Sequence, residues 1–406
     1  MTSPATQRIN SLDVLRGLAV LGILVMNIQA FSMPMASYVN PSAWGSLEGI
    51  NGVVWYLSHL LADQKMMALF SMLFGAGIIL FSERVAAQGG SATAYHYRRN
   101  FWLLLFGAAH AYLLWFGDIL FLYAICAFLL YPLRNLRPRN LVVLALVFLS
   151  VSSVIYLLMG MALPTLPETV VAEGILPSWR PDAQQLATEI AAYQGGWADQ
   201  MTARLPATLE MHTFVFLIWG FWRAAGMMLL GMALYRTGVL TAQASNTVYL
   251  RFLAAAAVVG LPVVAFGIHW NFSNNWGLES MFLGYQFNYW GSILVSLGWM
   301  AGTVLLLKHQ RLTGLTNRLA AVGRMAFTNY IMHTLLCGFI FYGHGLGLFA
   351  QVERVGQIAF VFGIWALQLW LSPIWLKHFR FGPLECLWRS LTYKERQALG
   401  YGNPNP

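Results

Sequence analysis

The stretch Leu141–Leu163, LVVLALVFLSVSSVIYLLMGMAL, decides the fold class of this chain. Its 23 residues carry no charge, and a helix needs about 20 apolar residues to cross the hydrocarbon core of a bilayer. Three further runs are nearly free of charge: Phe101–Phe116, Ile119–Leu130 and Ile358–Leu371. They are too continuous for barrel strands, which are about ten residues of alternating polarity. Since backbone groups in hydrocarbon must bond internally, the sequence predicts an all-α, polytopic transmembrane helical bundle.

The composition supports a membrane protein and excludes an ordinary soluble domain. Only 10% of the 406 residues are charged and 58% are hydrophobic, whereas soluble domains carry about 25% charged residues. The net charge of +9 could suggest nucleic acid, but the basic residues follow the predicted topology. With the N-terminus inside, 18 of the 24 Lys and Arg fall on cytoplasmic ends and loops. The positive-inside rule therefore accounts for the charge without nucleic acid and predicts that both termini are cytoplasmic.

The predicted helices divide the chain into three parts. An N-terminal five-helix bundle (1–163) precedes an acidic extracytoplasmic loop (164–210), in which Asp182–Met201 is expected to form an amphipathic helix. A C-terminal five-helix region with a cytoplasmic tail follows (211–406). The three cysteines are scattered, so neither a disulfide framework nor a metal site is expected. The ten predicted spans are 12–31, 65–82, 100–116, 119–133, 141–163, 212–235, 248–270, 285–307, 325–349 and 355–376.

The first predicted span contains three polar residues. Asp13 and Arg16 lie one turn apart near its start, so we expect either a simple (i, i+3) ion pair or an Arg16 that meets an anionic ligand from the cytoplasm. Because these charges interrupt the apolar run, the segment is interpreted as an uncleaved helix rather than a signal peptide. Asn27 lies three turns further. Such a residue either joins helices or stabilises a reacting group.

Two histidines in the N-terminal half are spaced to meet carboxylates. His59 and Asp63 are four residues apart, next to Lys65, and the alternative interpretation is an interfacial pair with a snorkelling lysine. His110 lies ten residues into the third predicted span, and Asp118 follows at the next turn. Charging a histidine inside the bilayer is costly, so we expect a neutral imidazole. It is either a general base or a hydrogen-bonding partner of another helix.

The C-terminal half offers three further candidates for substrate binding. Arg223 is flanked by Trp219 and Trp222 in the sixth span, a pattern typical of either cation–π packing or an anion site. Asn329 and His333 are four residues apart on the ninth span and could line a cavity from its cytoplasmic half. Because isolated polar groups in lipid are costly, we also expect His110, Asn27 and Asp63 to converge on one pocket.

Four stretches resemble the YeiB-like bacterial membrane proteins, and the second half resembles the domain of unknown function 418. The stretches are Arg8–Gly17 (RINSLDVLRG), Lys65–Gly77 (KMMALFSMLFGAG), Phe106–His110 continuing through Gly117-Asp118, and Gly382–Tyr393 (GPLECLWRSLTY). The resemblance implies a ten-helix protein of the bacterial plasma (inner) membrane, and a role in transport is associated with that family.

The opening also resembles the heparan-glucosaminide acetyltransferase family, through Leu12-Asp13, Arg16-Gly17, Asn27 and Asp63. That resemblance implies acyl transfer from cytoplasmic acyl-CoA to a small-molecule or envelope-glycan acceptor across the membrane. The family's catalytic histidine follows the first helix, and this chain has no histidine between Asn27 and Leu57.

Two functions are therefore expected, of which acyl transfer leads. In that interpretation Arg16 and other cytoplasmic arginines hold the donor phosphates, with Lys65, Arg223, Asn329 and His333 as further binding residues. His110 is the base, oriented by Asp118 or Asp63, and Asn27 stabilises the reacting carbonyl. The alternative is a transporter in which the same residues form a substrate and proton path. The partners expected are membrane lipids and a second copy of the chain, with no metal and no nucleic acid.

Overall fold

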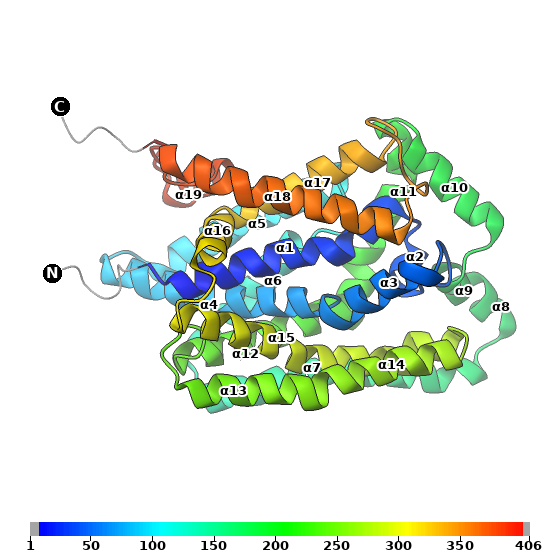
Figure 1. Cartoon of the computed structure of the whole chain (residues 1–406), viewed down its shortest axis with the longest axis horizontal. Coiled ribbons are helices and arrows are strands. Elements are labelled where there is room, and N and C mark those ends of the chain that lie inside the picture. The colour runs from blue at the N-terminus through cyan, green and yellow to red at the C-terminus, as the bar shows by residue number, and fades with distance from the viewer. Residues whose placement is uncertain (1–7, 401–406) are drawn as a thin grey trace.

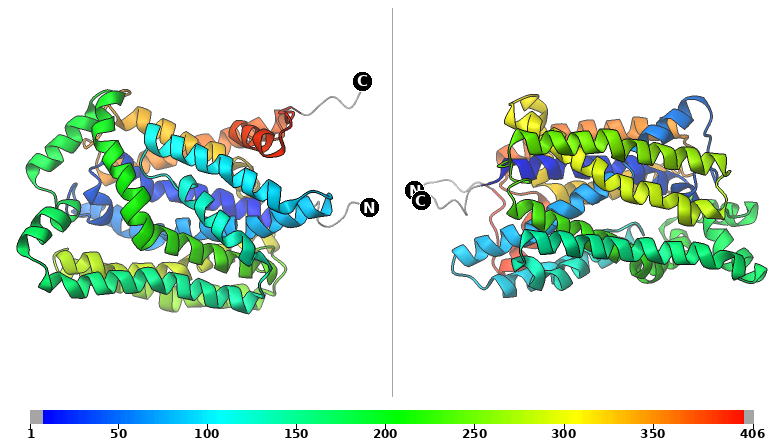
Figure 2. Two further views of the ribbon diagram at one scale, coloured as in Figure 1. Left: turned by 180° about the vertical axis from the view of Figure 1, so that it is seen from behind. Right: turned by 90° about the horizontal axis from the view of Figure 1, so that it is seen from below.

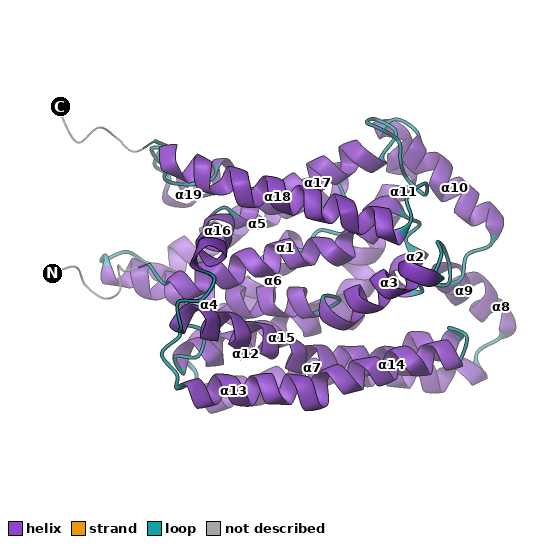
Figure 3. Cartoon of the chain, viewed as in Figure 1, coloured by secondary structure: helices purple, strands orange, loops and turns teal. Residues whose placement is uncertain are grey.

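The structure, a computed structural model, describes residues 8–400, and within them the chain is helical, without a strand (Figures 1 and 3). Seven helical stretches in this part are long and apolar enough to cross a membrane, and two shorter apolar helices accompany them. With the helix Ala92–Leu113, these correspond to the ten predicted spans. The prediction of an all-α polytopic bundle is confirmed.

The first half of the bundle contains α1 to α7. The helices are α1 (Asn10–Ser32), α2 (Ala36–Val39), α3 (Gly49–Leu61), α4 (Lys65–Ala87), α5 (Ala92–Leu113), α6 (Leu120–Leu130) with a 3-10 turn (Tyr131–Asn135), and α7 (Pro138–Ala162) with a 3-10 turn (Leu163–Thr165).

The loop that follows and the second half contain the remaining helices. They are α8 (Glu168–Val170), a π-helical turn (Val171–Ile175), α9 (Leu176–Trp179), α10 (Ala183–Gln194), α11 (Trp197–Glu210), a π-helical segment (Met211–Gly220), α12 (Phe221–Arg236), α13 (Asn246–Ala255), a π-helical turn (Ala256–Gly260), α14 (Leu261–Ser273), a π-helical turn (Ser280–Gly284), α15 (Tyr285–Lys308), α16 (Thr313–Arg324), α17 (Ala326–Phe341), α18 (Arg354–His378) and α19 (Pro383–Tyr393).

Both ends of the described chain lie at the same end of the bundle (Figure 1). That end also holds α19 and the hairpin between α4 and α5, while α8 to α11 lie at the opposite end (Figures 1 and 2). The positive-inside rule assigns the first end to the cytoplasm. The same rule predicts that the acidic segment 164–210 lies outside.

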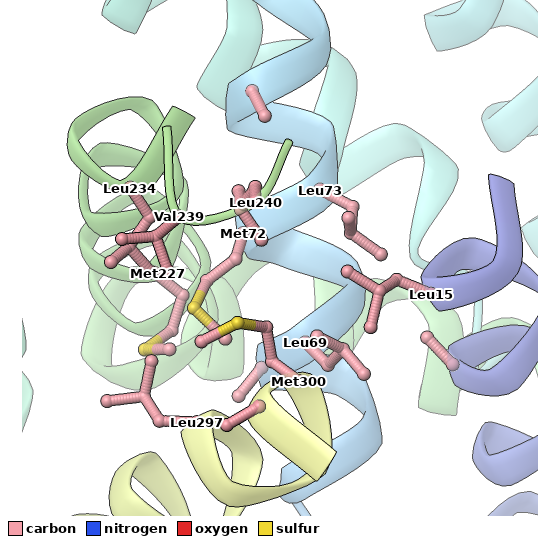
Figure 4. Close-up of a cluster of buried hydrophobic side chains, with 14 of the residues drawn as sticks. Leu15, Leu69, Met72, Leu73, Met227, Leu234, Val239, Leu240, Leu297 and Met300 are labelled. Atoms are coloured by element: carbon pink, nitrogen blue, oxygen red, sulfur yellow. The ribbon is translucent and has the colours of Figure 1, made fainter. Parts of the chain in front are cut away.

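Helices from both halves of the sequence pack into one bundle. The central α1 contacts α4, α16, α17 and α18, and α12 packs against α4 and α7. The main core gathers around α4 (Figure 4). Its labelled side chains are Leu15 from α1, Leu69, Met72 and Leu73 from α4, Met227 and Leu234 from α12, Val239 and Leu240 from the following turn, and Leu297 and Met300 from α15.

Two helix crossings depend on glycine. A Cβ atom on Gly231 of α12 would lie 1.9 Å from the carbonyl oxygen of Met72 in α4, and one on Gly323 of α16 would lie 1.8 Å from the carbonyl oxygen of Asp13 in α1. Because lipid gives helices no hydrophobic reason to associate, close backbone approach at small residues is a main source of their packing energy.

Some predicted helix boundaries were wrong. The helix α5 begins at Ala92 rather than residue 100, so His110 lies in its last turn rather than its middle. The amphipathic segment breaks at Gly195-Gly196 into α10 and α11, and α11 continues without interruption to Arg236. The ninth span ends at Phe341 rather than residue 349. Hydropathy misses these limits because helix ends outside lipid are set by capping and packing.

Candidate functional site

A cavity of about 600 Å³ opens among α1, α4, α5, α6, α17 and α19. Its wide part is lined by residues of the cytoplasmic end of the bundle, such as Arg8, Gln88 and Gln397. Its walls then follow α1 and α4 inward, past Leu12 and Leu73. The cavity therefore connects the cytoplasmic face with the interior of the bundle.

The cytoplasmic mouth of this cavity is strongly basic. Seven arginines and three carboxylates line it. Asp13 pairs with Arg16, whose Nη1 is 3.1 Å from Asp13 Oδ1, so the ion pair that was one of the two alternatives for Arg16 is present; Asp13 also pairs with Arg8. An excess of guanidinium groups suits phosphate or carboxylate ligands. The seven arginines are Arg8, Arg16, Arg84, Arg99, Arg324, Arg380 and Arg389.

The C-terminal helix α19 forms one wall of the mouth. Trp388 donates a hydrogen bond from Nε1 to the carbonyl oxygen of Arg99 at 2.8 Å, and the Arg99 guanidinium lies 4.3 Å from the Trp388 ring. Glu385 accepts hydrogen bonds from the backbone N–H groups of Phe327 and Thr328 at the start of α17. Burial raises the pKa of the Glu385 carboxyl above its usual value.

Deeper in, the cavity becomes apolar and aromatic. Phe70 and Phe74 of α4 pack against Tyr123 of α6, with ring centroids 5.9 and 5.2 Å apart. The Tyr123 hydroxyl hydrogen-bonds to Ser71 at 2.6 Å. Leu120 and Tyr330 also line this part. The cavity thus changes from cationic to apolar along its depth.

His110 lies directly behind the inner wall of the cavity. Its ring centroid is 5.3 Å from that of Tyr330. Nδ1 is 2.7 Å from Asp118 Oδ1, and Nε2 is 2.8 Å from the hydroxyl oxygen of Thr334 on α17. Both partners of the His110–Asp118 pair are buried, with side chains 1% and 0% exposed. The structure therefore brings together the histidine and the carboxylate that the sequence had paired.

The turn between α5 and α6 fixes Asp118 in this position. Its other carboxylate oxygen accepts a hydrogen bond from the backbone N–H of Phe121 at 2.7 Å, which caps the first turn of α6. Gly107 permits the tight hairpin, because a Cβ there would lie 2.2 Å from the backbone nitrogen of Phe121. A carboxylate only accepts, so the arrangement in which Asp118 acts as a carboxylate would put the proton on Nδ1 of His110 and leave Nε2 as the acceptor nitrogen.

Asp63 belongs to a second buried polar group, at the break between α3 and α4. Its carboxylate accepts from Asn288 Nδ2 at 2.6 Å and lies 3.2 Å from His59 Nδ1. Lys65 is 0% exposed, so it does not snorkel as considered from the sequence. Its Nζ donates to Asn288 Oδ1 at 2.5 Å and to the carbonyl oxygen of His59 at 2.7 Å. The Asn288 amide thus bridges the ammonium and the carboxylate.

The two polar groups adjoin a shared apolar cluster. Met26, Ala62 and Ile119, the chain neighbours of Asn27, Asp63 and Asp118, belong to or pack against one set of side chains. Asn27 itself is half-buried, and its side chain makes no hydrogen bond within residues 8–400. The structure therefore places Asn27, Asp63 and Asp118 around common packing without a hydrogen bond among them. None of His110, Asn27 and Asp63, which were expected to share one pocket, lines the cytoplasmic cavity.

The remaining predicted binding residues lie outside the cavity lining. Arg223 stacks on Tyr289, 4.6 Å from its ring centroid, rather than on the flanking tryptophans, and donates to the Tyr289 carbonyl. His333 Nε2 lies 2.8 Å from Gln368 Oε1, and Gln368 Nε2 donates to the carbonyl oxygen of Asn329. Asn329 and His333 thus join α17 to α18.

Several residues of this region were not found from the sequence. Thr334 and Tyr330 contact His110 across more than 200 residues of chain. Tyrosine and threonine in an apolar helix carry no distinctive signal, so they would have emerged only from the i, i+4 spacing of Tyr330 and Thr334 on α17. Within the part of the chain that the structure describes, no three His, Cys, Asp or Glu side chains gather as metal ligands.

Comparisons with known proteins agree with the sequence resemblance. A family model described as "Protein of unknown function (DUF418)" matches residues 234–395. The chain is 31% identical to the uncharacterized protein YeiB of Escherichia coli (strain K12), over 95% of this chain and 96% of that protein. It is also 31% identical to the uncharacterized protein YxaH of Bacillus subtilis (strain 168), over 97% of this chain and 96% of that protein.

Proposed function

We propose that this chain, which belongs to the YeiB-like family of multi-pass membrane proteins with a DUF418 region, transfers an acyl group across the membrane. The donor is a cytoplasmic acyl-CoA, and the acceptor is a hydroxyl or amine of an extracytoplasmic molecule such as an envelope glycan. The membrane would be the bacterial inner membrane.

The observation that carries the proposal is the polarity gradient of the cytoplasmic cavity. Acyl-CoA has phosphates at one end and an acyl thioester at the other. Seven arginines at the mouth match the phosphates, and the apolar inner part suits the acyl arm. The inner wall residue Tyr330 contacts His110. The donor would thus enter phosphate-last, with its thioester toward the His110–Asp118 pair.

The proposed chemistry is general-base acyl transfer. His110 Nε2 takes the proton of the acceptor hydroxyl or amine as its oxygen or nitrogen bonds to the thioester carbon. The carbon–sulfur bond then breaks, and the thiolate leaves with the proton that His110 returns. Asp118 stabilises the transient imidazolium through Nδ1, as in other histidine–aspartate pairs. Asn27 is proposed to support the carbonyl oxygen and Asp63 to orient the acceptor.

In this structure the Thr334 hydroxyl is hydrogen-bonded to Nε2 of His110, the nitrogen that would act as the base. An acceptor hydroxyl would either displace Thr334 or pass its proton through it. Since His110 and Thr334 are both buried, we expect helix movement around the α5–α6 turn during turnover. Such gating is common where a site must exclude water.

The test is transfer of radiolabelled acetyl groups in membranes. We expect labelled acceptor with the wild type, and a loss of about 10²–10⁴-fold in His110→Ala with acetyl-CoA binding retained. His269→Ala, which removes an exposed histidine on α14, is the control and should match the wild type. Loss of acetyl-CoA binding in His110→Ala would refute the assigned role.

Transport is the second candidate, because three membrane-crossing stretches contain π-helical segments: Met211–Gly220, Ala256–Gly260 and Ser280–Gly284. Such segments often mark functional sites. A transporter would form no acylated product. Binding of a donor-like anion without product, for any acceptor tested, would favour transport over transfer.

A further inference from the structure

A buried arginine lies at the predicted extracytoplasmic end of the bundle, opposite the end at which the arginine-lined cavity opens. Arg204 on α11 is 1% exposed and forms no ion pair within residues 8–400. Nη1 donates to the carbonyl oxygen of Leu113 at 2.8 Å, and Nη2 donates to Gln200 Oε1 at 2.8 Å. Gln200, 0% exposed, is held in turn by Gly195 and His344. The guanidinium is thus fixed in place but not neutralised.

Two other hydrogen-bond donors beside Arg204 are buried without a partner among the described residues. The Tyr342 hydroxyl and the Trp115 indole nitrogen make no hydrogen bond to that part of the chain, although these residues are only 1% and 2% exposed. Both belong to one packed cluster, against which Ala203 and Ala207 of α11 also lie. Tyr342 is linked to Arg204 through Gln200 and His344: Gln200 binds Arg204 and lies 3.0 Å from His344 Nδ1, and the His344 and Tyr342 ring centroids are 5.9 Å apart.

This group of residues has donors but lacks a counter-charge within residues 8–400. The carboxylate of Glu189 on α10 does not supply it, because its Oε1 accepts from the backbone N–H of Met35 at 2.9 Å and no ion pair joins it to Arg204 among the described residues. A buried cation and buried unpaired donors are each costly to desolvate. A ligand that supplies negative charge and acceptor oxygens would neutralise Arg204 and would give the two unpartnered donors an acceptor.

We propose that Arg204, Tyr342 and Trp115 form a binding site for an anionic group, a carboxylate or a phosphate, that enters from the extracytoplasmic side. The helices α10 and α11 lie at this end of the bundle (Figures 1 and 2), and their separation would admit the ligand. The planar guanidinium suits either group, because both offer paired oxygens.

The site lies next to the proposed catalytic pair. The Trp115 ring centroid is 6.3 Å from that of His110, and Arg204 binds the carbonyl oxygen of Leu113, three residues after His110. Identifying the ligand as the acyl acceptor rests on the proposed function. Binding of the anion does not, so the two can fail separately.

The experiment measures thermal unfolding of the purified full-length protein at constant ionic strength, with sodium phosphate, sodium acetate or sodium chloride. We expect a saturable rise in Tm with phosphate or acetate that chloride does not reproduce. A response to phosphate alone identifies a phosphate group, and a response to acetate identifies a carboxylate. The seven cavity arginines also attract anions, so an Arg389→Gln variant measures how much one of them contributes and serves as the background for the variants below.

Three variants distinguish anion binding at Arg204 and Tyr342 from anion binding elsewhere on the protein. Tyr342→Phe should weaken the response retained in Arg389→Gln by about 10-fold or more, while the ligand-free Tm stays equal or rises because an unpartnered hydroxyl is removed. Arg204→Gln should weaken the same response, and Arg180→Gln, an exposed arginine on the same side, should not.

The opposite pattern overturns the proposal. A Tyr342→Phe variant with a lower ligand-free Tm and an unchanged anion response would mean that buried water satisfies the hydroxyl. An equal response to chloride would mean a general salt effect. Should Arg204→Gln not fold, Tyr342→Phe still decides the question, because it removes one oxygen atom and keeps the ring.

Discussion

Replacing Asp118 with asparagine tests the central pair with little change of shape. The carboxylate accepts from His110 Nδ1 at 2.7 Å and from the Phe121 N–H at 2.7 Å. An asparagine amide can donate its N–H₂ to His110 while its oxygen still accepts from Phe121. Both contacts survive, but the ring proton must move from Nδ1 to Nε2. The acceptor nitrogen that faces Thr334 is then lost.

The magnitude follows from that change of tautomer. The equivalent aspartate-to-asparagine change in serine proteases lowers kcat by about 10⁴-fold with the geometry intact, and general-base catalysis contributes about 10²–10⁴-fold. We therefore expect Asp118→Asn to lose about 10²–10⁴-fold in acyl transfer, with the free energy of unfolding changed by about 1 kcal/mol or less.

The assay pairs transfer of radiolabelled acetyl groups with thermal unfolding of the same preparation. Activity within a few-fold of the wild type would refute the role of His110 as a base held in one tautomer. A large fall in Tm together with the loss of activity would show instead that the pair holds the α5–α6 turn together. We expect acetyl-CoA binding to be retained in Asp118→Asn, whether or not Tm falls, because Asp118 lies outside the cavity lining.

Two further predictions concern packing and pH. Gly231→Ala should destabilise the protein by about 1–3 kcal/mol, because its Cβ would overlap the Met72 carbonyl; Gly363→Ala, which meets no atom within 4 Å, should not lower Tm. Burial raises the pKa of Glu385, so its protonated form favours the docked α19. That contribution is complete below the ordinary value of about 4.3 and is lost as pH rises through the raised pKa. The protection of α19 amides relative to their intrinsic, base-catalysed exchange rate should therefore fall as pH rises, and Glu385→Gln should abolish this dependence; an identical pH profile of protection in the variant would contradict it.

Contacts within a helix or between successive helices were accessible from the sequence. The Asp13–Arg16 ion pair follows from one turn of helix, and the His59–Asp63 contact follows from i, i+4 spacing. His110 and Asp118 meet because the hairpin between them is short. In each case fewer than ten residues separate the partners, so local geometry leaves few alternatives.

Contacts between helices that are far apart in the sequence could not be predicted from the sequence. Cation–π packing of Arg223, one of the two alternatives considered, is formed with Tyr289 on α15 rather than with the neighbouring tryptophans. Lys65 found Asn288 rather than the membrane surface. These outcomes depend on which helix faces are turned toward each other, and a nearly uniform apolar composition does not encode rotation about a helix axis.

The sequence by itself determined that this is a multi-pass membrane protein with a helical backbone, and it predicts which end faces the cytoplasm. Those properties follow from summed hydrophobicity and charge, which need no knowledge of contacts. Only the tertiary structure decided that seven arginines share one mouth, that Thr334 reaches His110, and that Arg204 is buried without a counter-charge among the described residues. The physical reason is that helix pairing in a membrane rests on close backbone approach and a few polar contacts between helices remote in sequence, and their positions are fixed only when the whole bundle is packed.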